Sequence, residues 1–188
     1  MTEGHDAKAT EGHGFTPLDE DLIYEGWIIT VAKGRFQAPD GSTFERDVVH
    51  HPGAVAVVPI DGDDIVLVRQ YRSAINDTLW EIPAGLRDVD GEPPAKTAQR
   101  ELIEEVGLRA GSLEHLTAVH NSVGFCDEQI HIFLGTDLEP VERALTDSPE
   151  EREMEISRIP LVDAESMIAT GEITDAKTII GILAALRR

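Results

Sequence analysis

Glutamates and an apolar stripe share the segment 93–106 at spacings that a helix brings together. At about 100° per residue, its alanine, leucine and valine side chains fall on one face, which predicts packing against a core. Glu101, Glu104 and Glu105 fall on another face. Prolines at the start and Gly107 just after the end mark the expected termini. The chain must therefore fold so that this helix is half-buried and its acidic face is neutralised.

The acidic face predicts a cation site. Glu101 and Glu105 are one helical turn apart, so their carboxylates can converge, although like charges at that spacing destabilise a helix. Oxygen-rich clusters of this kind select magnesium, manganese or calcium, and Arg100 is placed to neutralise part of the charge. A solvated acidic surface is the alternative. The loop GLRDVDGE at 85–92 favours the metal, because backbone carbonyls at a glycine turn and the carboxylate of Glu92 can support it.

The stretch from Gly85 to Leu108 resembles the Nudix box, G-x5-E-x7-R-E-U-x-E-E-x-G-U, in which U is an aliphatic residue. After Glu92 and seven further residues, the letters RELIEEVGL match the second half of the motif completely. The one departure is a loop of six residues, instead of five, between Gly85 and Glu92. One extra loop residue costs little. The sequence is therefore identified as a member of the Nudix hydrolase family.

Other stretches are similar to the ADP-ribose pyrophosphatase branch of that family. They are VRQYR at 68–72, LWEIPAG at 79–85 and GFCDE at 124–128, and a β-rich segment also precedes the box. The resemblance implies hydrolysis of ADP-ribose to AMP and ribose 5-phosphate. The branch usually has a proline where this chain has Val123, so another nucleoside diphosphate sugar or a dinucleotide is the alternative substrate. A non-catalytic ADP-ribose-binding module and an acidic interaction protein are more distant alternatives.

The resemblance also implies a ligand set for Mg²⁺ or Mn²⁺. Glu101, Glu105 and the backbone carbonyl of Ala84 would bind the metal, and Glu104 would be a further ligand, a partner of the ligands or a catalytic group. Metal bound in this way bridges the diphosphate, withdraws charge from it and activates water. Positioning and electrostatics would then lower the barrier to in-line attack at phosphorus.

A general base is expected on the segment DSPEEREMEI at 147–156, because related pyrophosphatases use a glutamate from a mobile loop after the box. The segment is polar and lies between two expected elements. Glu150 and Glu151 are the favoured candidates, and the sequence does not choose between them. The alternative is that both are ordinary loop charges.

Four further residues are expected to contact the substrate. Arg72 and Arg46 suit bidentate recognition of phosphate or ribose oxygens, with surface salt bridges as the alternative. Trp27 follows Gly26 at an aromatic position of the family and would stack on adenine, unless it serves a core or dimer contact. Glu128, in GFCDE, would contact ribose or metal.

The order of expected elements favours an α+β fold, a sandwich with a mixed sheet preceded by a small antiparallel β segment, and the family resemblance implies the α/β/α layers of a Nudix domain. Strands are expected within 22–36 and at 54–60 and 64–71, with helices at 160–172 and 174–188. Residues 1–16 are expected to be a disordered tail. The segment 17–52 would form the N-terminal β segment, which takes part in dimerisation and the substrate pocket, and 53–188 the Nudix catalytic domain.

The net charge of −20 bears on partners. It argues against nucleic acid and against anionic membranes, because both need basic surface. A small nucleoside diphosphate remains compatible, since metal ions screen it. No apolar run reaches the roughly 20 residues of a membrane span, the N-terminus lacks a signal-peptide pattern, and Cys126 is the single cysteine. We therefore expect a cytoplasmic protein, and the family resemblance implies a homodimer.

Overall fold

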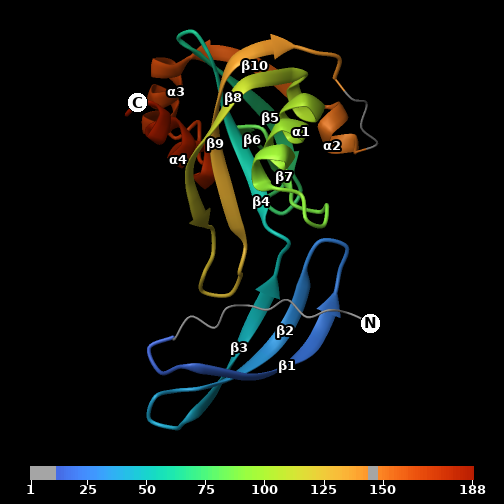
Figure 1. Ribbon diagram of the computed structural model, residues 1–188, viewed down its shortest axis with the longest axis vertical. Helices are drawn as coiled ribbons and strands as arrows, with labels where there is room; N and C mark the ends of the chain where they lie inside the picture. The colour runs from blue at the N-terminus through green and yellow to red at the C-terminus, as the bar shows by residue number, and fades with distance from the viewer. Residues whose placement is uncertain (1–11, 144–147) are drawn as a thin grey trace. The chain divides into compact units, whose positions relative to one another are not determined.

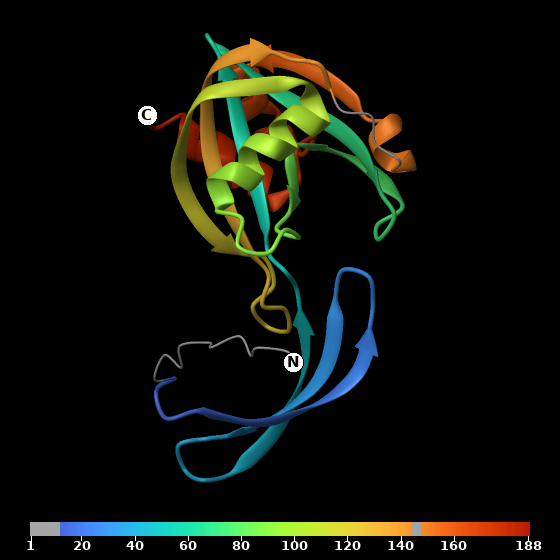
Figure 2. The same cartoon turned by 45° about the vertical axis from the view of Figure 1, so that its right-hand side comes forward.

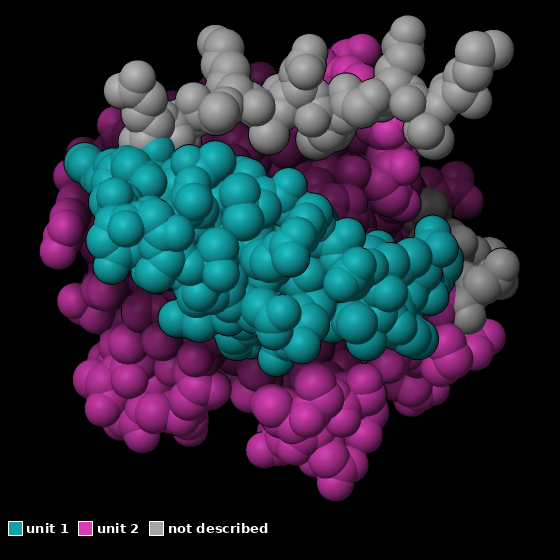
Figure 3. All heavy atoms as spheres, turned by 90° about the horizontal axis from the view of Figure 1, so that it is seen from below, with its two compact units in different colours: residues 1–51, 122–127 teal, residues 52–121, 128–188 magenta. Residues whose placement is uncertain are grey.

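The computed structural model describes residues 12–143 and 148–188 and divides the chain into two compact units. Unit 1 takes in the chain up to residue 51 together with 122–127, and unit 2 holds 52–121 and 128–188 (Figure 3). Most of the tail expected at 1–16 lies outside the described residues. No helix within 12–143 or 148–188 is long and apolar enough to cross a membrane.

Unit 1 is a three-stranded antiparallel sheet of order β1-β2-β3 (Figure 1). Its strands are β1 (Thr16–Glu25), β2 (Thr30–Gln37) and β3 (Thr43–His50). The segment 122–127 adds to β3, where the amide of Val49 donates to the carbonyl of Phe125 at 2.7 Å. The small antiparallel β segment expected before the box is thus present.

Unit 1 buries little of its own apolar surface. Of its described residues, only Ala32 and Gly34 are buried, and β1 is exposed along its whole length. Trp27, in the turn between β1 and β2, is 97% exposed. A three-stranded sheet that buries so little apolar surface has marginal stability by itself.

Unit 2 is built on a seven-stranded sheet of order β10-β5-β4-β9-β8, with β6 paired to β5 and β7 to β4. Strands β4 and β9 are parallel, whereas the other pairs are antiparallel. The mixed sheet expected from the sequence is therefore confirmed. The strands are β4 (Ala54–Asp61), β5 (Asp64–Arg72), β6 (Asp77–Glu81), β7 (Ala84–Leu86), β8 (Leu108–His120), β9 (Gln129–Pro140) and β10 (Glu155–Pro160).

Helices cover both faces of this sheet (Figure 2). Helix α1 packs on one face, and α3 and α4 pack on the other. Their bounds are α1 (Pro94–Val106), α3 (Leu161–Thr170) and α4 (Ala176–Ala185), and a short helix α2 (Pro149–Arg152) precedes β10. The expected α/β/α sandwich is thus observed.

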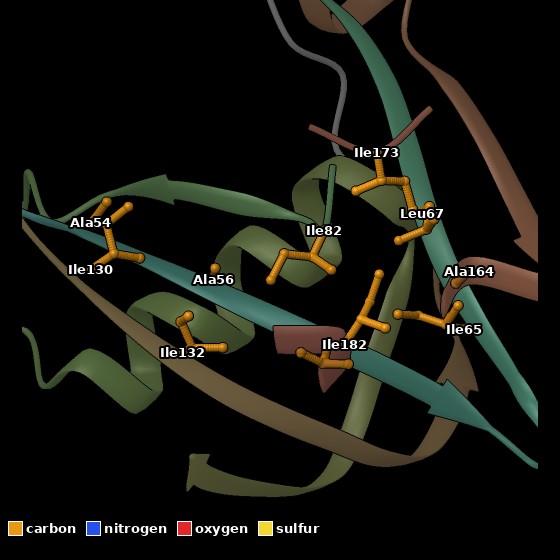
Figure 4. Close-up of a cluster of buried hydrophobic side chains, with 11 residues drawn as sticks. Ala54, Ala56, Ile65, Leu67, Ile82, Ile130, Ile132, Ala164, Ile173 and Ile182 are labelled. Atoms are coloured by element: carbon orange, nitrogen blue, oxygen red, sulfur yellow. The ribbon is translucent and has the colours of Figure 1, made fainter. Parts of the chain in front are cut away.

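Strand β4 separates two cores because its alternate side chains point to opposite faces. Val55 and Val57 join the core under α1, which includes Leu102 of that helix. Ala54 and Ala56 join the core under α3 and α4, where Figure 4 shows them with residues such as Ile130 and Ile182. This alternation fixes which residues of the sheet face the acidic helix.

The expected ends of α1 agree closely with those observed. Helix α1 ends at Gly107, whose φ of 65° is the left-handed conformation that glycine adopts at a helix C-terminus. Helices α3 and α4 are each shorter than the segments expected to form them. The 147–156 segment, expected as a loop, contains α2 and the first two residues of β10. Asp175 caps α4, and the preceding residues stay outside it.

Candidate active site

Two glutamates of α1, which helical spacing places one turn apart, are buried against β7. Glu101 and Glu105 are 8% and 5% exposed. The carboxylate of Glu101 occupies the space above Gly85, where an added Cβ would lie 2.0 Å from its Cδ. The amide of Ala84 donates to Glu105 Oε2 at 2.9 Å. The position of the Glu101 carboxylate therefore requires glycine at position 85, the last residue of the segment 83–85 that we call the PAG turn.

Burial perturbs both carboxylates. It raises the pKa of Glu105 to about 8. The hydrogen bond from the amide of Ala84 opposes this rise, and the negative charges of Glu101 and Glu151 add to it. It raises the pKa of Glu101 to about 7, although Arg100 opposes the shift. Adjacent buried carboxylates with raised pKa values are typical of functional sites, where a cation would stabilise their charged forms.

Arg100 lies among four carboxylates and neutralises part of the cluster, as expected. Its Nη1 is 2.6 Å from Glu101 Oε1 and 3.2 Å from Glu104 Oε2. Its Nη2 is 3.2 Å from Asp88 Oδ1 and 3.5 Å from Glu92 Oε2. Glu92 thus supports the cluster through Arg100.

The donor set fits a hard divalent cation. Glu101 and Glu105 supply oxygen atoms beside the backbone of the PAG turn, and oxygen ligands suit magnesium and manganese. In the described part of the chain, no three His, Cys, Asp or Glu side chains are already gathered as a metal cluster. Glu104 is turned toward Arg100. The pair of buried carboxylates is therefore the core of the candidate site, and Glu104 lies at its side.

Arg72 is anchored to a glutamate that the sequence analysis did not single out. Its Nε and Nη2 each donate to the Glu81 carboxylate at 2.6 Å, and Glu81 is 1% exposed. Lys177 of α4 pairs with the same carboxylate and, at 3.0 Å, with Asp175. Burial by itself would raise the pKa of Glu81, but Arg72 and Lys177 hold it below its ordinary value.

This network connects the C-terminal helix to the PAG turn. The Thr178 hydroxyl accepts a hydrogen bond from the amide of Ile82 at 2.9 Å, and Asp175 accepts from the amide and hydroxyl of Thr178. Ile82 lies two residues before Ala84. The start of α4 therefore holds the segment that leads into β7 and the candidate site.

The candidate base segment contacts α1 through Arg143. Its Nε donates to the carbonyl of Glu104 at 3.0 Å, and its Nη2 donates to the carbonyl of Glu151 at 3.1 Å. The charge of Glu151 contributes to the raised pKa of Glu105. Glu150 is exposed on the same short helix and is not among the largest contributors to the raised pKa of Glu105.

The remaining expected substrate residues are distributed over both units. Trp27 and Arg46 belong to unit 1, where Arg46 lies 4.8 Å from the centre of the Phe44 ring. Glu128 belongs to unit 2 and accepts a hydrogen bond from Asn121 at 2.8 Å. Their roles toward a substrate stay predictions.

Comparison with known proteins agrees with this architecture. The NUDIX domain model matches residues 50–180. The ADP-ribose pyrophosphatase of Mycobacterium tuberculosis is 39% identical over 173 residues, which are 92% of this chain and 83% of that protein. The ADP-ribose pyrophosphatase of Bacillus subtilis is 37% identical over 166 residues, 88% of this chain and 89% of the relative. A solved structure described as an ADP compounds hydrolase has the same fold, with a TM-score of 0.80, 24% identity and 92% coverage of both chains.

Proposed function

Because the chain belongs to the NUDIX-domain family, we propose that it hydrolyses the diphosphate bond of ADP-ribose and releases AMP and ribose 5-phosphate. The observation that carries the proposal is the pair of buried carboxylates, Glu101 and Glu105, held against the PAG turn. Relatives named ADP-ribose pyrophosphatase, similar over most of the chain, support the choice of substrate.

Glu101, Glu105 and the carbonyl of Ala84 would hold Mg²⁺ or Mn²⁺. When bound, such a cation neutralises the diphosphate and lowers the pKa of a water molecule. Arg100 has two roles in this scheme: it opposes the rise in the pKa of Glu101 that burial causes, and it restrains Glu104 until a cation competes for that carboxylate. Glu104 would then act as an additional ligand or orient water.

Glu151 is the better candidate for the general base. Glu151 is partly buried and its charge raises the pKa of Glu105, whereas Glu150 is exposed. A base must come within hydrogen-bond reach of the attacking water, directly or through one more water. The contact of Arg143 with both Glu104 and Glu151 keeps the base segment near the acidic helix.

Arg72 would bind the diphosphate while anchored to Glu81. Two of its nitrogens are taken by the Glu81 carboxylate, and its side chain is still 43% exposed. The donors that remain can bind phosphate oxygens, for which guanidinium is well suited. Lys177 helps balance the charge of Glu81, so Arg72 is not fully neutralised by its anchor.

The adenosine end would be recognised by Trp27 and Arg46 of unit 1, and Glu128 would contact a ribose or the metal.

We also propose a homodimer, because apolar side chains of unit 1, including Leu22 at 61% and Ile23 at 65%, are exposed, and such patches mark interaction surfaces. The measurement is solution mass by light scattering; a fully active monomer would contradict it. A single cysteine supports a cytoplasmic location.

The deciding experiment is product chromatography after incubation with ADP-ribose and Mg²⁺ or Mn²⁺. We expect AMP and ribose 5-phosphate, lost in Glu105→Gln and retained in Glu165→Gln, a control on the exposed side of α3. A panel of nucleoside diphosphate sugars and dinucleotides runs in parallel. Cleavage of a panel compound but not of ADP-ribose would replace ADP-ribose as the assigned substrate. Val123, which stands where the branch usually has a proline, would then be the residue to examine for the altered specificity. No cleavage of any compound would refute the catalytic proposal.

A further inference from the structure

One row of backbone pairs leads from the metal-facing turn to a histidine. Val55 of β4 pairs with Gly85 of β7 on one side and with His131 of β9 on the other. Paired residues point to the same face, and Ala54 and Ile130, next to them in sequence, point to the opposite one (Figure 4). His131 therefore faces the same side as Glu101, two strand spacings from Gly85, or about 10 Å.

The side chain of Arg87 lies against Gly53, the residue before β4, and its charge acts on His131. Its amide donates to the carbonyl of Gly53 at 3.1 Å. Its Cδ and Nη1 lie 3.7 and 3.8 Å from the position that a Cβ on Gly53 would take. Gly53 has a φ of 86°, where larger residues are strained. Because Gly53 has no side chain, the Arg87 side chain can lie against its backbone.

A second histidine completes the group. His131 Nδ1 lies 3.3 Å from His115 Nε2 on the neighbouring strand β8, and the His115 ring meets Phe133 edge-on at 5.3 Å. His115 is exposed, so the group is open to solvent. Burial lowers the pKa of His131, and the charges of Arg87 and His115 lower it further. The charge of the guanidinium therefore acts on His131.

Arg87 is unusual because it lacks an acidic partner in a chain of net charge −20. Among residues 12–143 and 148–188, no carboxylate forms an ion pair with its guanidinium, and its Nε is buried without a hydrogen bond. Arg100 also has a buried Nε without a hydrogen bond, but its two Nη atoms contact four carboxylates. A buried donor left unbonded costs free energy, so an external anion beside Arg87 would supply both the missing acceptor and the missing negative charge.

An anion explains the group better than a metal ion does. Two histidines alone make a weak metal site, and the described residues supply no third ligand beside them. The positive charge of Arg87 would also repel a cation. An oxyanion, in contrast, would accept hydrogen bonds from the guanidinium and from imidazole N–H groups.

We propose that Arg87, His131 and His115 form an oxyanion subsite for a phosphate or carboxylate carried by the sugar beyond the diphosphate. The subsite lies on the same face of the sheet as the carboxylate pair, at a separation that one sugar unit can span. Its role in catalysis rests on the proposed function: the enzyme would prefer nucleoside diphosphate sugars whose terminal sugar is itself acidic. The anion-binding property itself does not depend on hydrolysis.

The first test uses metal-free protein and inorganic phosphate at pH 7.5. The ring signals of His115 and His131, assigned with His115→Gln and His131→Gln, are followed by NMR during the titration. We expect both to shift together in the wild type and in Arg109→Met, a control on β8. They should stay unmoved in Arg87→Met and shift partly in Arg87→Lys. Equal shifts in the wild type and Arg87→Met, or none in either, would overturn the proposal.

The second test compares ADP-ribose with ADP-ribose phosphorylated on its terminal ribose. We expect kcat/KM to be higher for the phosphorylated compound, on the order of tenfold, because of charge-assisted hydrogen bonds. The gain should come through KM and vanish in Arg87→Met, with kcat for ADP-ribose itself little changed. A preference that persists in Arg87→Met would overturn the subsite. Phosphate binding through Arg87 without any hydrolysis would overturn the proposed function alone.

Discussion

Replacement of Lys177 by methionine tests how the buried charges near the site are balanced. Methionine keeps most of the side-chain length and fills the space, but Glu81, 1% exposed, loses one of two cations. Removal of one partner from a buried ion pair costs about 3–5 kcal/mol. Arg72 keeps both hydrogen bonds to Glu81, so we expect roughly half of that, about 2 kcal/mol at pH 7.

The pH dependence gives the prediction its sign. The pKa of Glu81 is lowered in the folded protein, so this residue contributes stability above its unfolded pKa that is lost as pH falls through the folded pKa. Without Lys177, burial is less well opposed and the folded pKa rises. The variant therefore protonates Glu81 at a higher pH than the wild type. The destabilisation should be largest near pH 7 and shrink toward pH 4.

Urea unfolding of the metal-free protein at pH 7 and pH 4.5 measures both effects. Lys96→Met, at an exposed position of α1, is the matched control and should change stability by less than about 0.5 kcal/mol. In a Glu81→Gln background, Lys177→Met should cost less than it does in the wild type, because the buried carboxylate that Lys177 helps to neutralise is absent. A loss under about 0.5 kcal/mol in Lys177→Met, or one of equal size at both pH values, would refute this account.

Three other outcomes follow from the geometry of the acidic helix. Gly85→Ala places a Cβ 2.0 Å from the Glu101 carboxylate carbon, so Mn²⁺ affinity and kcat should each fall at least about tenfold. Gly124→Ala, with open space around the added Cβ, should change neither value. Unchanged Mn²⁺ affinity and kcat in Gly85→Ala would contradict the packing of Glu101 on Gly85. Because the pKa of Glu105 is raised to about 8, the stability that its protonated form provides is complete below its unfolded pKa and is lost as pH rises through 8. Thermal unfolding in EDTA should therefore show a lower Tm at pH 8.5 than at pH 5, a difference that Glu105→Gln reduces and whose absence would exclude the shift. Glu151→Gln should lower kcat by roughly 100-fold or more and Glu150→Gln should not; the reverse order in steady-state kinetics would reassign the base.

The acidic helix could be predicted because its signals are local. Apolar residues at helical spacing, prolines at one end and Gly107 at the other all lie within one short segment, and the observed helix is Pro94–Val106. The convergence of Glu101 and Glu105 followed from the same spacing, but their burial did not, because it depends on β7 packing against the helix. The mixed sheet also followed from the order of strands and helices, which lacks a strict βαβ alternation.

The charge network around Glu81 could not be predicted in this way. A strand residue in LWEIPAG gives no sign of which face it takes, and its partner Lys177 lies 96 residues away. The sequence therefore led to Arg72 as a substrate contact without revealing its anchor. Arg87 was missed for a related reason. Its lack of a carboxylate partner is a property of the folded chain, and charge counts alone suggest abundant partners.

The division of the chain into units has a consequence for modularity. Unit 1 is discontinuous in sequence, since it includes 122–127 as well as the residues up to 51. Val49 exchanges two hydrogen bonds with that distant segment. A chain that starts at residue 52 would thus lose the three strands of unit 1 but keep the segment 122–127. The backbone groups of that segment that bond to Val49 would then have no partner. The N-terminal sheet is therefore not a cassette that recombination could exchange at a single crossover; grafting it onto another scaffold requires replacing two stretches of the gene at once.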